Sequence, residues 1–443
     1  MKVKGSTLAE LAAGLENGQT TSRALVEDAL EAIEVDPRAF TRIDVAGARA
    51  AADAADRSRR EGRAASPLAG IPVSIKDLFD VAGQPTPAGS AILANAPPAT
   101  ADAPAVARLK AAGLVVVGRT QMSEFAFTGL GLNPHTPQPV NPIDPARVPG
   151  GSSGGAAVSV ALGQAAGALG TDTGGSVRIP AAFCGLAGFK PTQRRVSRAG
   201  AFPLSTTLDS IGPIARTAAC CAALDAIIAD VPPAPHPPVT LAGLRLCTAD
   251  HYFLAGMDAA VGHAFEAALA AISDAGASVE PISLPPLARI PAMNARGSIS
   301  NAESFALHRR LGLLDERDRY DPYVLARIEL AKAMPAADYL DLLAERDRLI
   351  SEIELVLAPY DALLTPTSPI LAPRFADIAE PAEFARLNGL VLRNPMVVNI
   401  LDRCAISLPL AAAPGAGLMV IGAPMTDTRL LALARALETS LRS

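Results

Sequence analysis

Gly170-Thr171-Asp172-Thr173-Gly174-Gly175-Ser176 is the stretch of this sequence that carries the most information about fold and chemistry. A second stretch of similar composition lies upstream, at Gly150-Gly151-Ser152-Ser153-Gly154-Gly155. In both, serine hydroxyls stand beside glycines, which let backbone N–H groups come close to a small reacting group. Either stretch alone is compatible with an ordinary tight turn. The two together, with a lysine upstream, indicate a site assembled from three segments.

The lysine is Lys76, which follows the apolar segment 71–75. A lysine in such a segment normally extends to the surface, and this is the default interpretation. The neighbours Val73, Ile75 and Leu78 indicate burial instead, which disfavours the charged ammonium group and lowers its pKa toward that of a general base. A buried neutral lysine needs a hydrogen-bonding partner, and a serine hydroxyl can both donate and accept.

Three familiar uses of glycine and serine fit these stretches less well. Residues 150–154 match the G-x-S-x-G nucleophile elbow, but that motif needs a preceding strand, and residues 141–149 contain three prolines. Neither stretch has the ending of a P-loop or the order of a dinucleotide-binding loop, so nucleotide binding is disfavoured. A Ser-His-Asp triad is also disfavoured, because none of the histidines lies in a recognisable catalytic context: His135, His236, His251, His263 and His308.

The composition is typical of an α/β enzyme. Half of the 443 residues are hydrophobic and 19% are charged, which fits a well-buried core. The net charge of −5 provides no basic surface, so we expect no nucleic-acid partner. The five cysteines lack the spacing of a metal or redox site, and we expect buried thiols. With no bilayer-spanning apolar run and no signal-peptide pattern at the N-terminus, we expect a cytoplasmic protein without membrane association.

Hydrophobic periodicity predicts an N-terminal helical segment followed by alternating strands and helices. A capping box is predicted at Thr7–Glu10, and a helix is predicted from Gly155 to about Ala168. The one plausible linker is the proline-rich stretch 231–238. Strands are predicted at 71–75, 114–117, 244–247, 277–281, 362–365, 405–408 and 418–421, and further helices at 103–112, 259–275, within the stretch up to about 357, and at 430–441. This alternation favours a sheet covered by helices.

Lys76, residues 150–155 and residues 170–185 closely resemble the amidase signature family, and the similarity continues through 188–192 and 208–216. It is looser at the N-terminal helices, at 363–367 and at 417–419. The resemblance implies the α/β fold class: one amidase-signature domain over residues 1–443, with a mixed central β-sheet covered by helices on both faces (α/β/α). It also implies an N-terminal helical segment of about 1–65, a catalytic core of about 66–230 and a variable, partly helical substrate-pocket region of about 240–400.

The same resemblance implies a Ser–cis-Ser–Lys triad. Carried onto this sequence, Ser176 is the nucleophile, Ser152 is the relay serine after a cis peptide bond, and Lys76 is the base. The N–H groups of Thr173, Gly174, Gly175 and Ser176 would form the oxyanion hole. No metal and no cofactor are implied.

For function, the resemblance implies a hydrolase that cleaves the C–N bond of a small, linear, non-peptide amide through an acyl-enzyme, with aryl esters, ureas and carbamates as further substrates to consider. The alternative is the amidase subunit of a multi-subunit amidotransferase or of a two-subunit hydrolase. We expect a monomer or homodimer, with an obligate partner subunit left open. The complete set of Lys76, Ser152 and Ser176 disfavours a non-enzymatic scaffold. The residues expected to bind the substrate are Met122, Phe125, Phe127, Gly129, Leu130 and Ser153, although core packing explains any one apolar member equally well.

Two arginines raise separate questions. Arg194 stands where the family usually has a glycine, and it would be strained if that position required a positive φ. Arg403 lies near a segment that approaches the active site in relatives, so it is a candidate contact for an acidic substrate. A surface salt bridge is the preferred interpretation of Arg403.

Overall fold

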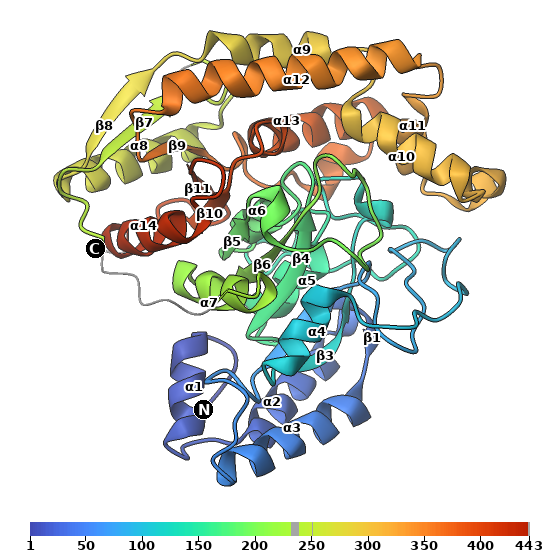
Figure 1. Ribbon diagram of the computed structural model, residues 1–443, viewed down its shortest axis with the longest axis vertical. Helices are drawn as coiled ribbons and strands as arrows, with labels where there is room; N and C mark the ends of the chain where they lie inside the picture. Colours follow the sequence, from blue (N-terminus) through green and yellow to red (C-terminus); the bar gives the residue numbers. More distant parts are fainter. Residues whose placement is uncertain (232–238, 250, 442–443) are drawn as a thin grey trace.

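A mixed sheet of eleven strands runs through the chain, in the order β1-β3-β2-β4-β6-β5-β10-β11-β9-β7-β8 (Figure 1). The computed structural model describes residues 1–231, 239–249 and 251–441. The strands are β1 Phe40–Ile43, β2 Pro72–Lys76, β3 Val115–Thr120, β4 Gly167–Asp172, β5 Ala187–Lys190, β6 Ser210–Ala215, β7 Arg245–Ala249, β8 Ser278–Ile282, β9 Ala362–Pro366, β10 Ala405–Pro409 and β11 Gly417–Ile421. Strand β2 is parallel to β3 and β4, β7 is parallel to β8 and β9, and the remaining pairs are antiparallel.

Helices cover both faces of the sheet, which confirms the predicted α/β/α fold. The helices are α1 Leu8–Glu16, α2 Ser22–Val35, α3 Val45–Arg60, α4 Pro104–Ala111, α5 Gly154–Ala161, α6 Arg178–Phe183, α7 Ala218–Ile228, α8 Ala259–Asp274, α9 Ile290–Met293, α10 Ile299–Arg310, α11 Pro322–Glu329, α12 Ala336–Leu357, α13 Pro381–Ile400 and α14 Asp427–Ser440. One continuous apolar cluster joins α1, α4, α7, α8 and α14 to the sheet. A second joins α3, α5 and α6 to it, and a third joins α12 and α13.

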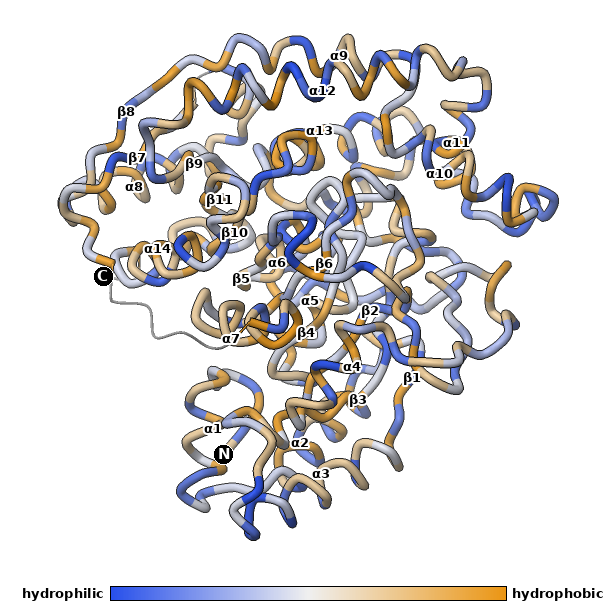
Figure 2. The backbone as a smooth tube through the Cα atoms, viewed as in Figure 1, coloured by the Kyte–Doolittle hydropathy of each residue, from blue (hydrophilic) through white to orange (hydrophobic). Residues whose placement is uncertain are grey.

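The two faces follow from the alternation of side chains along each strand. In β4, the adjacent residues Ala168 and Leu169 belong to different apolar clusters because successive side chains of a strand point to opposite faces. The outermost long helix, α12, buries Leu342, Leu349 and Ile353 at helical spacing, and Figure 2 shows hydrophilic and hydrophobic residues alternating along it. Such an amphipathic pattern places the helix at the surface with one face on the core.

Most predicted elements are found within a few residues of their expected bounds. The capping box at Thr7 and Glu10 is confirmed, and all five cysteines are buried free thiols, as expected. No helix in the described ranges is long and apolar enough to cross a membrane. The expected cytoplasmic location stays a prediction, and residues 232–238 of the expected linker lie outside the described residues.

The predicted helix from Gly155 to about Ala168 was wrong at its end. Helix α5 stops at Ala161, and residues 167–172 form strand β4. Gly163 ends the helical segment because its φ is +79°, and a Cβ there would lie 2.4 Å from the Cβ of Lys4. Strands β1, β5 and β6 and helix α13 were not predicted. The first is a four-residue edge strand inside the segment expected to be helical.

Gly155 provides a test of the packing between α5 and the sheet. An added Cβ would lie 2.4 Å from the Ala39 carbonyl oxygen and 2.7 Å from the Gln121 backbone nitrogen, so Gly155→Ala should lower stability by about 1–3 kcal/mol. In the control Gly389→Ala, in α13, the new methyl meets nothing within 4 Å, and stability should stay level or rise by up to about 1 kcal/mol. Thermal unfolding midpoints check both; equal midpoints for the two variants would contradict the packing argument.

Candidate active site

The sheet brings two distant polar residues together at one edge. Strands β2 and β4 are parallel neighbours in which Ile75 pairs with Leu169. Because parallel strands end at the same edge of a sheet, Lys76 at the end of β2 lies beside the end of β4, where Thr171 and Asp172 are located.

Lys76 is fully buried and contacts two hydroxyls. Its Nζ lies 2.8 Å from Ser152 Oγ and 2.9 Å from Thr171 Oγ1. Burial lowers the pKa of Lys76 from its ordinary value to about 7, although the carboxylates of Asp209 and Asp172 act in the opposite direction. A substantial fraction of this lysine is therefore neutral near pH 7, as a general base must be.

Ser152 is held in a crowded turn. The Gly151–Ser152 peptide bond is cis, as the family resemblance implies. A Cβ on Gly151 would lie 2.5 Å from the backbone nitrogen of Gly131, so only glycine fits at this position. The expected absence of a strand before Ser152 is also confirmed, since β3 ends at Thr120 and α5 begins at Gly154.

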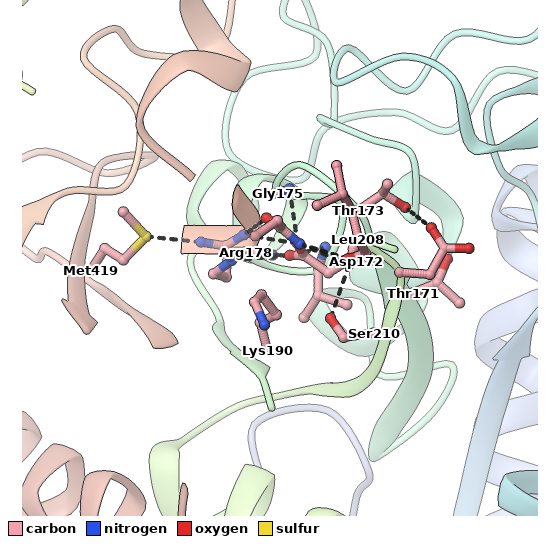
Figure 3. Close-up of polar contacts among 12 residues, drawn as sticks. Thr171, Asp172, Thr173, Gly175, Arg178, Lys190, Leu208, Ser210 and Met419 are labelled. Atoms are coloured by element: carbon pink, nitrogen blue, oxygen red, sulfur yellow. Dashed lines mark hydrogen bonds and ion pairs between the residues drawn. The ribbon is translucent and has the colours of Figure 1, made fainter. Parts of the chain in front are cut away.

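Asp172 organises the loop that carries Ser176 (Figure 3). Its carboxylate accepts hydrogen bonds from the backbone N–H groups of Gly175, at 2.9 Å, and Val177, at 3.1 Å. Arg178 Nη2 donates to the same carboxylate at 2.8 Å, and Asn399 Nδ2, from α13, donates to it at 3.0 Å. Burial by itself raises the pKa of Asp172, but the Arg178 guanidinium outweighs it and holds that pKa below its usual range.

Three of the four N–H groups expected to form the oxyanion hole lack a partner. Those of Thr173, Gly174 and Ser176 have no acceptor among the residues that the structure describes. The N–H of Gly175 is different, because it donates to Asp172. Buried N–H groups are normally paired, so three unpaired donors on one loop can receive an oxygen from outside the chain.

A pocket opens beside this loop. Thr173, Gly174 and Ser176 line it together with apolar side chains from α13 and the 204–208 segment. Its remaining walls come from Ala126–Thr128, from residues 293–300 and from Arg327 of α11. The pocket therefore lies between the predicted catalytic core and the predicted variable region, and it contains no carboxylate among its lining residues.

Of the six residues expected to bind substrate, the structure places Phe127 in the pocket wall. Met122, Phe125 and Leu130 are buried in the apolar core. The Gly129 N–H donates to Asn388 Oδ1 at 2.8 Å, and the Ser153 N–H donates to the carbonyl oxygen of Ser176 at 3.2 Å, which joins the two glycine-serine loops. The substrate-binding role of all six stays a prediction.

Several residues near the site were not assigned a role from the sequence. Thr171 lies inside the stretch that was singled out, and its position next to Asp172 could have been found from strand alternation. Asp209 accepts a hydrogen bond from Thr173 Oγ1 at 2.5 Å, and burial raises its pKa to about 6. Asn399 and Arg327 carry no local signal, because only the fold brings them near residues 172–176.

The two arginines in question are explained by ion pairs. Arg194 lies in a short 3₁₀ helix at Gln193–Arg195 and has no positive φ, so the conditional strain is absent. It pairs with Asp402 at 3.3 Å. Arg403 pairs with Glu354 and donates to the Gly422 carbonyl oxygen, as a salt bridge would, but its side chain is buried rather than on the surface.

Comparison with known proteins agrees with this geometry. The chain matches the Amidase family over residues 24–431. It is 38% identical over 451 residues to 2-amino-5-chloromuconic acid deaminase of Comamonas testosteroni, an alignment that covers 98% of this chain and 95% of that protein. It is 37% identical over 440 residues to a glutamyl-tRNA(Gln) amidotransferase subunit of Roseiflexus sp. (strain RS-1), covering 92% and 88%. A crystal structure of an amidase superposes with a TM-score of 0.89 at 35% identity, covering 98% of this chain and 100% of that one. The chain therefore belongs to the amidase signature family.

Proposed function

We propose that this enzyme hydrolyses the C–N bond of a small, linear, non-peptide amide through an acyl-enzyme on Ser176. The observation that carries the proposal is the buried contact of 2.8 Å between Lys76 Nζ and Ser152 Oγ, located beside the loop that brings Ser176 and unpaired N–H groups to one pocket. A base, a relay hydroxyl, a nucleophilic hydroxyl and oxyanion donors are the parts that acyl transfer needs. The same parts can act on aryl esters, ureas and carbamates.

In the proposed reaction, neutral Lys76 accepts the proton of Ser152 while Ser152 accepts the proton of Ser176. The freed Ser176 oxygen attacks the amide carbon, and the negative charge on the carbonyl oxygen is received by the N–H groups of Thr173, Gly174 and Ser176. The relay then returns the proton to the leaving nitrogen, and the C–N bond breaks. Water attacks the resulting ester through the same relay, which releases the acid and regenerates Ser176.

The second candidate is the amidase subunit of a larger enzyme. It is favoured by the 37% identity to a glutamyl-tRNA(Gln) amidotransferase subunit over 92% of this chain. The two candidates differ in whether the chain works alone. Purification from its native host under mild conditions, with a parallel assay of ammonia release by the isolated chain, distinguishes them. A partner that co-purifies and is needed for turnover would favour this second candidate, and full turnover without one would favour the independent hydrolase.

Replacing the proposed base tests the relay. Lys76→Met keeps the volume of a buried side chain but removes the amine, so we expect amide turnover to fall by about 100- to 10,000-fold. Lys190→Met is the matched control, because Lys190 is also fully buried and its Nζ donates to the Pro191 carbonyl oxygen at 2.6 Å, away from both serines. The control should keep most of its turnover. Equal losses in the two variants, or normal turnover in Lys76→Met, would refute the assignment of Lys76.

The pH dependence follows from the pKa of Lys76. The base acts in its neutral form, which dominates above its pKa of about 7. We therefore expect kcat/KM to fall about tenfold for each pH unit below 7 and to level off above that value. Asp209→Asn removes a negative charge that raises the Lys76 pKa, so it should move the acidic limb to lower pH. A profile that is flat from pH 5 to pH 9, or a limb that Asp209→Asn moves upward, would contradict this assignment.

A further inference from the structure

Arg327 is a cation placed in the wall of the pocket that Ser176 lines. It belongs to α11, and it shares the pocket with Thr173, Gly174 and Ser176. The neighbouring walls from α13 are apolar, with Leu392, Met396 and Ile400. A guanidinium in such surroundings loses much of its hydration, and this loss is unfavourable unless an anion compensates it.

The guanidinium has no such compensation within the described part of the chain. It makes no ion pair and no hydrogen bond to those residues, and its buried Nε is without a hydrogen-bond partner. Other arginines of the interior differ: Arg178 pairs with Asp172, Arg195 with Asp225 and Arg403 with Glu354. Because no Asp or Glu lines the pocket, the unpaired charge of Arg327 has no internal anion to bind there.

The position of Arg327 is nevertheless well defined. Asn301 Nδ2, on α10, donates to the Arg327 carbonyl oxygen at 2.8 Å. The guanidinium carbon lies 5.5 Å from the centre of the Phe127 ring, a cation–π contact. Burial lowers the pKa of Arg327 to about 10, so the group is still charged at neutral pH. The pocket thus holds a cation in a defined place with its hydrogen-bonding edge unused.

We propose that Arg327 binds a carboxylate of the substrate, so that the enzyme acts on amides that also carry a carboxylate group. The inference rests on the proposed hydrolysis at Ser176 and names its substrate class. A guanidinium offers parallel N–H donors that match the two oxygens of a carboxylate, and such a pair is stronger in a pocket of low polarity than in water. The pair would place the amide of a short dicarboxylic acid monoamide near Ser176, and it would reject neutral amides, which leave the arginine unpaired.

The test measures protection of Ser176 from a fluorophosphonate, a neutral reagent that labels nucleophilic serines. Malonamate, succinamate and glutaramate, which carry one carboxylate, are compared with the matched neutral diamides. We expect at least one monoamide to slow labelling of the wild-type protein at concentrations about 10- to 100-fold lower than its diamide requires. Arg327→Gln should abolish that difference, and Arg327→Lys, which keeps the charge but not the planar fork, should keep part of it. The same ratios are measured as kcat/KM and KM from ammonia release.

Arg296→Gln is the matched control, because Arg296 follows α9 near the pocket but is exposed and pairs with Asp338. It should keep the wild-type preference. Labelling of Ser176 without any preference for the monoamides would overturn the role of Arg327 and leave the proposed hydrolysis standing. Absence of labelling in the wild type would overturn the proposed hydrolysis itself, and the inference with it. Because the wild-type comparison alone decides between these outcomes, the test does not depend on the folding of an Arg327 variant.

Discussion

The buried ion pair of Asp172 and Arg178 is the interaction on which the candidate site depends. Asp172 ends β4, Arg178 begins α6, and the turn between them carries Ser176. The carboxylate uses the N–H groups of Gly175 and Val177 to hold this turn, while Asn399 ties it to α13. Removing one member of such a buried pair leaves an uncompensated charge, which is strongly unfavourable, so the turn has one stable conformation. That conformation leaves the neighbouring N–H groups unpaired.

The same carboxylate also takes part in the electrostatics of Lys76. Complete burial stabilises the neutral amine, while the negative charges of Asp172 and Asp209 stabilise the ammonium form. These opposing effects bring the pKa of Lys76 to about 7. A deeper burial without the two acids would make the lysine a weaker base, and a more exposed lysine would be protonated at neutral pH. Structure of the loop and basicity of the lysine therefore have a shared origin.

The pocket joins this uniform catalytic part to a more individual one. Its floor comes from the 173–176 turn, whereas Phe127, Met293 and Arg327 come from segments that surround the sheet edge. The interior arginines show the contrast clearly, since the Arg178 guanidinium has a carboxylate and an amide as partners and that of Arg327 has none among the described residues. A charge that the fold leaves unpaired next to a reactive hydroxyl indicates what the site is built to receive.

The sequence by itself determined the α/β class, most helices and strands, and the triad residues, because hydrophobic periodicity and short motifs are local properties of the chain. It also indicated the burial of Lys76 from its apolar neighbours. The end of α5, the strands β5 and β6 and the long helix α13 were decided by packing, as Gly163 shows through its contact with Lys4. The tertiary structure alone decided that Gly175 donates to Asp172, that Asn399 reaches the same carboxylate and that Arg327 stands unpaired in the pocket. The physical reason is that these relations join residues distant in the chain, and their energies depend on distance and burial, which a linear pattern does not contain.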